Sequence, residues 1–385
     1  MKILLIGEIY SNNLGDQLVY ETTRYQLEQI YPNASFEILD IMGRNKPVMK
    51  PQNINHNEPE VSHFKECVRN NLGKNMFMNH VLSIRSARCL KSYYEKTIQS
   101  RKFDLAVFTG GQLVSDMFVE YIYFICKILS MKSIPYVFNA VGLGVINKIS
   151  IQRYKKIFSA SSMKAITCRS NADDFNRIFF DSDEIAVETF DTAVSVRELY
   201  NRNTYPSNEI VGLGIMYTTR IPRVELLRFW TELIERLECD KINWKIFTTG
   251  CTQDYYLALD VLNSLQMHEK QKDKLLFDIP TSSKELVENI QEFSMIVSFR
   301  LHSHIIAYSY SIPSVAIYWD NKLVDFFKKI NRNNHVFKIN CNIDGIVSDI
   351  HVNLGLNGTL NNEDEMANVL SNLKKHILKI TSLSS

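Results

Sequence analysis

The residues with the clearest chemical potential lie in the segment Arg300-Leu301-His302. This segment follows the apolar run Met295–Ser298, and Leu301 and Ile305 repeat at the spacing of a buried helical face. The pattern predicts a strand that ends near Arg300 and a helix with His302 in its first turn. The guanidinium of Arg300 and the imidazole of His302 then lie together where the strand ends and the helix begins. There they can bind an anion and transfer a proton. The alternative is a structural arginine and a buried, hydrogen-bonded histidine.

A metal site is not expected in this segment. His304 lies about 200° around the predicted helix from His302, so the two imidazoles do not share a helical face.

A second polar segment, Asn13-Leu14-Gly15-Asp16, lies between the first apolar run of the chain and a helix predicted over 14–30. Asn13 can cap this helix, and Gly15 permits the close approach of another group. Asp16 places a carboxylate in the first turn, where it can accept a proton from a sugar hydroxyl. The segment lacks the G-x-G-x-x-G spacing of a dinucleotide site. The alternative is an ordinary polar turn that caps a helix.

Three further candidates follow predicted strands. Gly110-Gly111 comes directly after the strand 104–108, where paired glycines let backbone amides approach a ligand or simply form a tight turn. Arg169 follows the run 165–168 and is suited either to binding a carboxylate or phosphate at two points or to an interdomain salt bridge. Lys322, after the strand 314–318, adds positive charge or is a surface lysine on a capped helix.

In the identity and order of these candidate residues, the sequence resembles the polysaccharide pyruvyl transferase family, whose members attach pyruvate as a ketal to sugars of bacterial surface polymers. The most specific element is Arg300-Leu301-His302. The other residues that carry the resemblance are Asn13-Leu14-Gly15-Asp16, Gly110-Gly111, Arg169, the region of Asp191, Pro313, Tyr318, Asp320 and Lys322. The chain departs from the family pattern at Gln112, where a third glycine is usual.

The resemblance implies a two-domain fold similar to GT-B glycosyltransferases, phosphoenolpyruvate as donor substrate, no further cofactor, and a glycan or lipid-linked glycan as acceptor. His302 is then the general acid, and Asp16 orients or deprotonates the acceptor hydroxyl, although these two roles are interchangeable at this stage. The implied substrate-binding residues are Arg300, Leu301, Arg169, Lys322, Asn13, Gly15, Gly110 and Gly111. Two rival functions are a glycosyltransferase that uses a nucleotide sugar and a non-catalytic glycan-binding subunit.

Short β-branched runs alternate with longer amphipathic segments throughout the chain. The predicted strands are 2–6, 35–39, 104–108, 136–139, 165–168, 185–187, 210–216, 245–248, 295–298 and 314–318. Such alternation predicts an α/β fold of two doubly wound, Rossmann-like domains that face a cleft. We expect an N-terminal acceptor-side domain over 1–205, with a polar insertion at about 42–101. A C-terminal donor-side domain covers 206–385, and its last helix is a candidate to pack back on the first domain.

Composition narrows the function classes. The 385 residues include 44 Lys and Arg against 42 Asp and Glu, so the net charge of +2 lacks the basic excess of a nucleic-acid binder. The seven cysteines contain no C-x-x-C pair, which favours free thiols in the cytoplasm. No membrane-spanning segment is predicted. We expect the apolar segment 118–128 to be a buried helix rather than a surface that faces a membrane-bound acceptor. The sequence leaves open whether the chain associates with the inner face of the membrane, and what its oligomeric state is.

Overall fold

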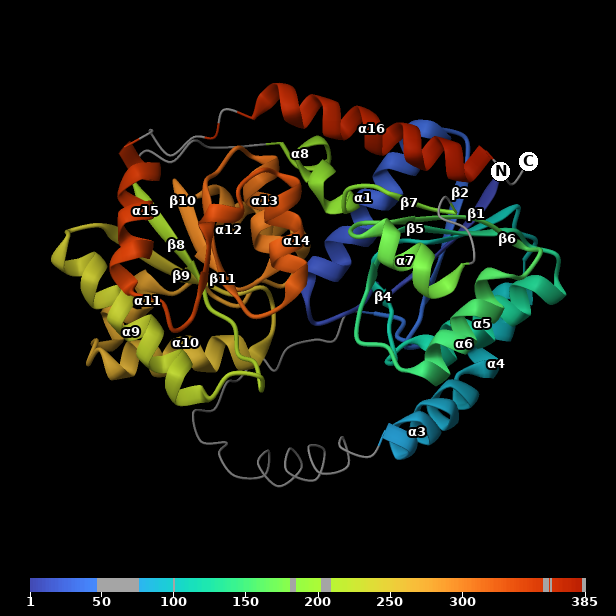
Figure 1. Cartoon of the computed structure of the whole chain (residues 1–385), viewed down its shortest axis with the longest axis horizontal. Coiled ribbons are helices and arrows are strands. Elements are labelled where there is room, and N and C mark those ends of the chain that lie inside the picture. The colour runs from blue at the N-terminus through green and yellow to red at the C-terminus, as the bar shows by residue number, and fades with distance from the viewer. Residues whose placement is uncertain are drawn as a thin grey trace. The chain divides into compact units, whose positions relative to one another are not determined.

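The computed structural model describes residues 1–46, 76–99, 101–180, 185–201, 209–355, 360 and 362–382. Half of the predicted insertion at 42–101, and the predicted domain boundary at 205/206, lie outside the described residues. The chain forms two compact units (Figure 1). Unit 1 comprises residues 1–10, 26–191 and 374–385, and unit 2 comprises residues 11–25 and 192–373.

This division differs from a single boundary at 205/206. Unit 2 starts at Thr192 and includes residues 11–25, because these residues make their contacts there: Leu14 N donates to Thr249 O at 3.1 Å, and Thr23 Oγ1 donates to Thr192 Oγ1 at 2.9 Å. The helices α1 (Leu14–Ile30) and α16 (Glu363–Ser382) each run from one unit into the other. The end of α16 belongs to unit 1, where Thr381 and Tyr31 share a hydrogen bond.

Unit 1 contains a parallel sheet in the order β2-β1-β3-β5-β6-β7, with β4 paired to β5. Its strands are β1 (Lys2–Gly7), β2 (Ser35–Asp40), β3 (Leu105–Phe108), β4 (Gly111–Val114), β5 (Tyr136–Leu143), β6 (Met163–Cys168) and β7 (Ala186–Glu188). Its further helices are α3 (Met76–Cys89), α4 (Lys91–Gln99), α5 (Val119–Met131), α6 (Lys148–Phe158) and α7 (Ala172–Phe179). The sequence pattern did not predict β4, and it ended β5 four residues early; the strand continues to Leu143 although Ala140 adopts a positive φ of 48° within it.

The apolar segment 118–128 is a core helix. In α5, Val119, Ile122, Ile125 and Leu129 are buried on the sheet of unit 1, and the buried Glu120 accepts a hydrogen bond from Arg153 at 3.1 Å. The segment therefore contributes to the core rather than to an exposed apolar surface. In the described part of the chain, no helix combines the length and apolar character needed to cross a bilayer.

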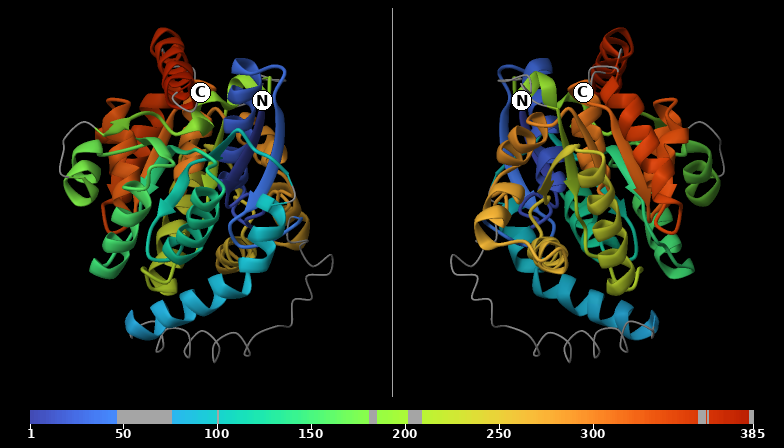
Figure 2. Two further views of the ribbon diagram at one scale, coloured as in Figure 1. Left: turned by 90° about the vertical axis from the view of Figure 1, so that its right-hand side faces the viewer. Right: turned by 90° about the vertical axis from the view of Figure 1, so that its left-hand side faces the viewer.

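Unit 2 contains a second parallel sheet, in the order β12-β11-β10-β8-β9. Its strands are β8 (Ile210–Gly214), β9 (Asn243–Phe247), β10 (Met295–Ser298), β11 (Ser314–Tyr318) and β12 (Val336–Lys338). Its further helices are α8 (Val196–Leu199), α9 (Arg223–Cys239), α10 (Thr252–Ser264), α11 (Glu269–Leu275), α12 (Ser283–Gln291), α13 (Leu301–Ser309), α14 (Asn321–Lys329) and α15 (Ile343–Gly355), with short 3₁₀ turns η1 (Thr192–Ser195) and η2 (Asn333–His335). Figure 2 shows the ribbon from two further sides.

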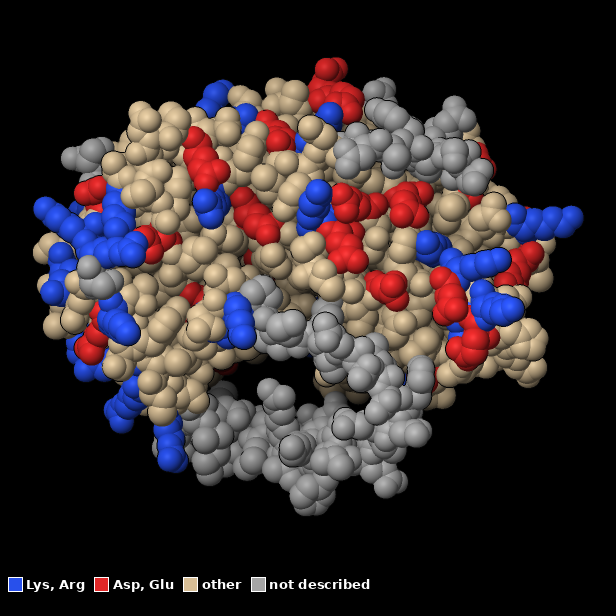
Figure 3. Space-filling model, turned by 180° about the vertical axis from the view of Figure 1, so that it is seen from behind, with Lys and Arg blue, Asp and Glu red and all other residues tan. Residues whose placement is uncertain are grey.

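Helix α9 of unit 2 packs on the sheet core through one apolar face. In α9, the buried residues Leu226, Trp230, Leu233 and Leu237 recur every three or four positions and pack in one core with residues of β8 and β10. On the face shown in Figure 3, side chains of both charge signs are interspersed. The six cysteines in the described ranges are all free. The prediction of two Rossmann-like α/β units is confirmed.

Candidate functional site

The candidate site of unit 2 lies at the carboxyl edge of its sheet. All strand pairs in this sheet are parallel, so the segments that follow β8, β9, β10 and β11 emerge at the same edge. Three of these segments lead directly into the first turns of α10, α13 and α14. This edge therefore gathers residues from distant parts of the sequence.

Arg300 follows β10 and reaches the first turn of α10. Its Nη2 donates to Asp254 Oδ2 at 2.7 Å, while Tyr217 N donates to Asp254 Oδ1 at 2.9 Å. Burial lowers the pKa of Arg300, but the Asp254 carboxylate, with further contributions from Cys251 and Asp16, raises it more. Burial also raises the pKa of Asp254, and Arg300 opposes that rise. The ion pair is thus held at the strand ends with little exposure, 19% for the Arg300 side chain and 1% for Asp254.

His302 lies directly against Gly15. A Cβ atom added to Gly15 would be 2.1 Å from Nδ1 and 2.4 Å from Cγ of the imidazole, so no other residue fits there without moving the ring. A second close approach joins the same segments: Gly250 has a φ of 108°, and a Cβ on it would be 2.7 Å from the carbonyl oxygen of Asn12. Unit 2 therefore brings the segment 11–16, the turn after β9 and the start of α13 together.

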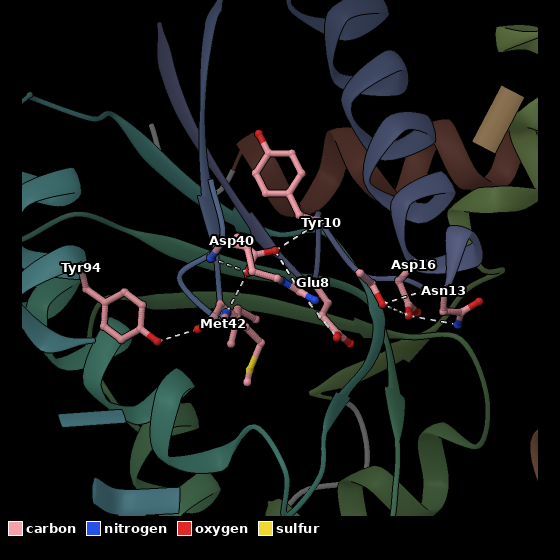
Figure 4. Close-up of polar contacts among 10 residues, drawn as sticks. Glu8, Tyr10, Asn13, Asp16, Asp40, Met42 and Tyr94 are labelled. Atoms are coloured by element: carbon pink, nitrogen blue, oxygen red, sulfur yellow. Dashed lines mark hydrogen bonds and ion pairs between the residues drawn. The ribbon is translucent and has the colours of Figure 1, made fainter. Parts of the chain in front are cut away.

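Asp16 is oriented by its own turn. Its Oδ2 accepts hydrogen bonds from Asn13 Nδ2 at 3.0 Å and from Ser11 Oγ at 3.3 Å, and Asn13 Oδ1 accepts one from Gly15 N at 3.3 Å (Figure 4). The Asp16 carboxylate also lies close enough to Arg300 to raise its pKa. Asp16, His302 and Arg300 are thus neighbours in unit 2.

His304 has a different environment from His302. It is fully buried, its Nε2 lies 2.9 Å from Ser298 O, and its ring packs edge-on against Phe327. Burial lowers the pKa of His304 to about 4, so the imidazole is neutral near pH 7. His304 is a core residue, as its place on the opposite side of the helix from His302 indicates.

The other predicted residues of unit 2 flank this group. Leu301 is buried in the first turn of α13, and Lys322 stands in the first turn of α14, whose N-terminus is capped by Asp320. The Lys322 ammonium lies 4.6 Å from the centre of the Trp319 ring, and Trp319 Nε1 donates to Phe299 O at 2.6 Å. Lys322 is therefore connected through Trp319 to the residue that precedes Arg300.

The predicted residues of unit 1 have backbone and ion-pair roles there. Gly110 and Gly111 have φ values of 107° and 77°, which favour glycine and explain the pair as the turn from β3 into β4. Arg169 Nη1 donates to Asp191 Oδ2 at 2.6 Å, and both side chains are buried. A Cβ on Gly142 would be 2.7 Å from Arg169 Nε. The ion pair forms within unit 1, in contrast to the interdomain alternative.

A buried carboxylate that sequence analysis did not single out, Asp40, also lies in unit 1. Its oxygens accept hydrogen bonds from Tyr10 N and Met42 N, each at 2.9 Å, and from Arg44 Nε at 3.0 Å (Figure 4). Because both oxygens are occupied by these donors, Asp40 fixes the loops after β1 and β2. Within the described residues, no group of three or more His, Cys, Asp or Glu side chains is arranged to hold a metal ion.

One protein-family model matches most of the chain. The model of the family described as polysaccharide pyruvyl transferase matches residues 13–321, which include both the Asn13–Asp16 segment and the Arg300–His302 segment. The chain belongs to the polysaccharide pyruvyl transferase family. This assignment supports a transferase that modifies a polysaccharide, and it confirms the resemblance seen in the sequence. Comparison with curated protein sequences gives no match.

Solved structures similar to this polysaccharide pyruvyl transferase family member include two epimerases. UDP-GlcNAc 2-epimerase from Neisseria meningitidis, bound to UDP-GlcNAc, is 11% identical with a TM-score of 0.55, over 98% of this chain and 100% of the other. UDP-GlcNAc 2-epimerase from Methanocaldococcus jannaschii is 11% identical with a TM-score of 0.53, over 91% of each chain. At this identity the likeness shows the fold alone, and it agrees with the predicted GT-B-like class.

Three residues at the site of this family member were missed by sequence analysis: Thr248, Thr249 and Asp254. Thr248 and Thr249 follow β9 directly and precede Gly250. This polar turn at the end of a strand could have indicated them as candidate site residues. Asp254 gave no signal of its own, because its contact with Arg300 joins residues 46 positions apart. Only the packing of α10 beside the ends of β8 and β10 shows its role.

Proposed function

We propose that this chain transfers a pyruvyl group from phosphoenolpyruvate to a sugar of a bacterial surface polysaccharide or of its lipid-linked precursor. The product is a pyruvate ketal, and inorganic phosphate is released. The proposal includes a cytoplasmic location, which the scattered free cysteines favour.

The observation that carries the proposal is the contact of His302 with Gly15. It brings an imidazole, the Asp16 carboxylate and the Arg300 guanidinium together from segments almost 300 positions apart in the family's matching region. Ketal formation needs these three kinds of group: an acid, a base and a fixed cation for an anionic donor.

The reaction balances with the protons of the two substrates. One sugar hydroxyl attacks the central carbon of phosphoenolpyruvate while the enol methylene receives a proton and becomes a methyl group. A second hydroxyl then attacks the same carbon, the bond to the phosphate oxygen breaks, and the phosphate leaves with the second hydroxyl proton. In this scheme His302 delivers the proton to the methylene, and Asp16 accepts the proton of the attacking hydroxyl.

The remaining predicted residues take binding roles in this proposal. The phosphate of the donor carries a charge of about −1.5 to −2 near neutral pH, and Arg300 and Lys322 supply positive charge for it in unit 2. Leu301, Asn13 and Gly15 shape the same site. In unit 1, Gly110 and Gly111 are assigned to the acceptor side, and Arg169 supports that side through its buried ion pair with Asp191 rather than by contact with a substrate.

The test is to incubate the purified chain with phosphoenolpyruvate and a panel of lipid-linked or nitrophenyl glycosides, and to follow released phosphate and acceptor mass. We expect phosphate release together with a mass gain of one pyruvate less one water. A nucleotide sugar in place of phosphoenolpyruvate is the matched control. Glycosyl transfer from that control, with no pyruvylation of any acceptor, would replace the proposal with the glycosyltransferase alternative. Glycan binding without any transfer would favour the non-catalytic subunit.

A further inference from the structure

The turn between β9 and α10 contains two buried hydroxyls that lack hydrogen bonds. Thr248 and Thr249 are 0% and 1% exposed, and neither Oγ1 atom has a partner among the described residues. A buried polar atom without a partner costs about 1–3 kcal/mol, so such atoms are rare and call for an explanation. The turn leads into the first turn of α10, which the side chain of its N-cap residue, Cys251, does not cap. Backbone N–H groups at such a helix start attract anions.

A third unpaired donor lies beside this turn. Arg300 Nη2 bonds to Asp254 in the first turn of α10, but Arg300 Nε is buried and has no partner in the described part of the chain. Since β8 lies between β10 and β9, the Arg300 side chain crosses the end of β8 to reach α10. The two hydroxyls after β9 and the guanidinium N–H after β10 are therefore donors at the same edge of the sheet, and an anion with several oxygens is the ligand that could accept from all of them.

Asp254 fixes the arginine in this position. It is buried, and each of its oxygens accepts a hydrogen bond: Oδ1 accepts from Tyr217 N after β8, and Oδ2 accepts from Arg300 Nη2 after β10. The carboxylate thus ties the guanidinium to a backbone position and keeps Nε on the remaining side for another acceptor. Because Asp254 offsets part of the Arg300 charge, directed N–H and O–H bonds add to the positive charge that a ligand meets here.

We propose that the turn 248–251 and Arg300 Nε bind the phosphoryl group of a phosphate ester, and that Asp254 is a positioning residue for Arg300. The inference rests on the proposed function for the identity of the ester, phosphoenolpyruvate. The phosphoryl group of a nucleotide sugar has the same chemistry, so the experiment includes both sources.

The experiment compares Thr248→Val, Thr249→Val and wild type by calorimetric titration with inorganic phosphate, phosphoenolpyruvate and UDP, and by thermal unfolding with and without phosphate. Thr231→Val, at a half-buried position of α9, is the matched control. We expect each site variant to weaken phosphate and phosphoenolpyruvate binding about tenfold or more, as for a hydrogen bond to a charged group. Without phosphate, the two valine variants should unfold at the same or a higher temperature than wild type, because valine removes an unpaired hydroxyl. The increase in unfolding temperature that phosphate causes should be smaller in the variants than in wild type.

Asp254→Asn tests the positioning role. Asparagine keeps an oxygen for Tyr217 N but loses the charge that holds Arg300. We expect the KM for phosphoenolpyruvate to rise about tenfold, while the KM for the acceptor glycan stays within twofold of wild type. A variant with equal losses toward both substrates, or with a lower unfolding temperature and no change in KM, would show a merely structural carboxylate.

The outcomes separate this inference from the proposed function. If the wild type turns over phosphoenolpyruvate but the three site variants bind and react like Thr231→Val, the phosphoryl site is wrong and the proposed function stands. If phosphate binding depends on Thr248 and Thr249 but only UDP sugars react, the site stands and phosphoenolpyruvate is the wrong ester. Lower unfolding temperatures for both empty valine variants would assign the hydroxyls to structure and overturn the inference.

Discussion

Both sheets carry an arginine directly after a buried strand, Arg169 after β6 in unit 1 and Arg300 after β10 in unit 2, and each pairs with a buried aspartate. Arg169 and Asp191 are both almost fully buried, and the guanidinium lies across Gly142. Arg300 is more exposed, its Nε has no partner among the described residues, and the unpaired hydroxyls of Thr248 and Thr249 follow β9 at the same edge of the sheet. The same sequence feature therefore predicts a ligand site only where the fold leaves donors unpaired.

The largest expected effect concerns the reacting group of unit 2. His302→Asn should lower the turnover number about 10²- to 10⁴-fold, the contribution of a positioned general acid, while circular dichroism and the unfolding temperature stay close to wild type. Phosphate release from phosphoenolpyruvate measures the loss. His351→Asn, an exposed histidine of the same unit, is the control. Loss of fold in the His302 variant would assign this residue to the core, as for His304.

The matching change in unit 1 should affect stability instead. Asp191→Ala leaves the Arg169 charge buried without its carboxylate, so the free energy of unfolding should fall by about 3–5 kcal/mol. Urea unfolding measures this change. Glu95→Ala removes an exposed i,i+4 pair with Lys91 and should cost less than about 0.5 kcal/mol. If Asp191→Ala keeps its stability and loses binding of a substrate, Arg169 belongs to a ligand site and the contrast between the two arginines is wrong.

The sequence predicted the parts of the fold that have strong local patterns. The run Met295–Ser298 with Leu301 and Ile305 gave β10 and α13 because a buried strand and a buried helical face both leave periodic apolar residues. It did not predict α11, which has no buried residue and hence no apolar face, or β12, which is three residues long and only partly buried.

For the candidate site, too, the sequence predicted individual residues but not the contacts between them. Arg300, His302 and Asp16 were found from residue type and place at element ends, but their contact was not, since Gly15 and His302 meet through tertiary packing. Asp254 and the two threonines were missed because an unpaired buried donor is a property of the packed structure. The inclusion of residues 11–25 in unit 2 was missed for the same reason.

His304 permits a test of the contrast between the two histidines of α13. Its pKa is about 4 in the folded chain against an ordinary 6.5, so the unfolded chain binds more protons between these values. The stability from the neutral His304 is fully present above pH 6.5 and is lost as the pH falls toward 4. A shift of this size corresponds to about 3 kcal/mol. We expect the free-energy difference between wild type and His304→Gln to change by that amount between pH 7.5 and 4 in urea unfolding. Parallel curves for wild type and His304→Gln would contradict the assignment.

Gly15 gives the smallest but most specific test, because a single methyl group separates its two explanations. If Gly15 is only part of a helix cap, Gly15→Ala should be neutral or slightly stabilising, since alanine favours helix more than glycine by about 1 kcal/mol. If the imidazole of His302 occupies that space, the new Cβ must displace the ring, and the variant should lose about 1–3 kcal/mol of stability through overpacking.

The activity of the same variant should fall about 10²-fold, because a displacement of about 1 Å in a reacting group has an effect of that size. Gly355→Ala is the matched control: a Cβ there meets no atom within 4 Å. The double variant Gly15→Ala/His302→Asn tests whether the added methyl group acts through His302. If the methyl group acts only by moving His302, the double variant should be no less active than His302→Asn alone, since the ring is already gone. Additive losses would mean that Gly15 acts on the substrate independently of the histidine.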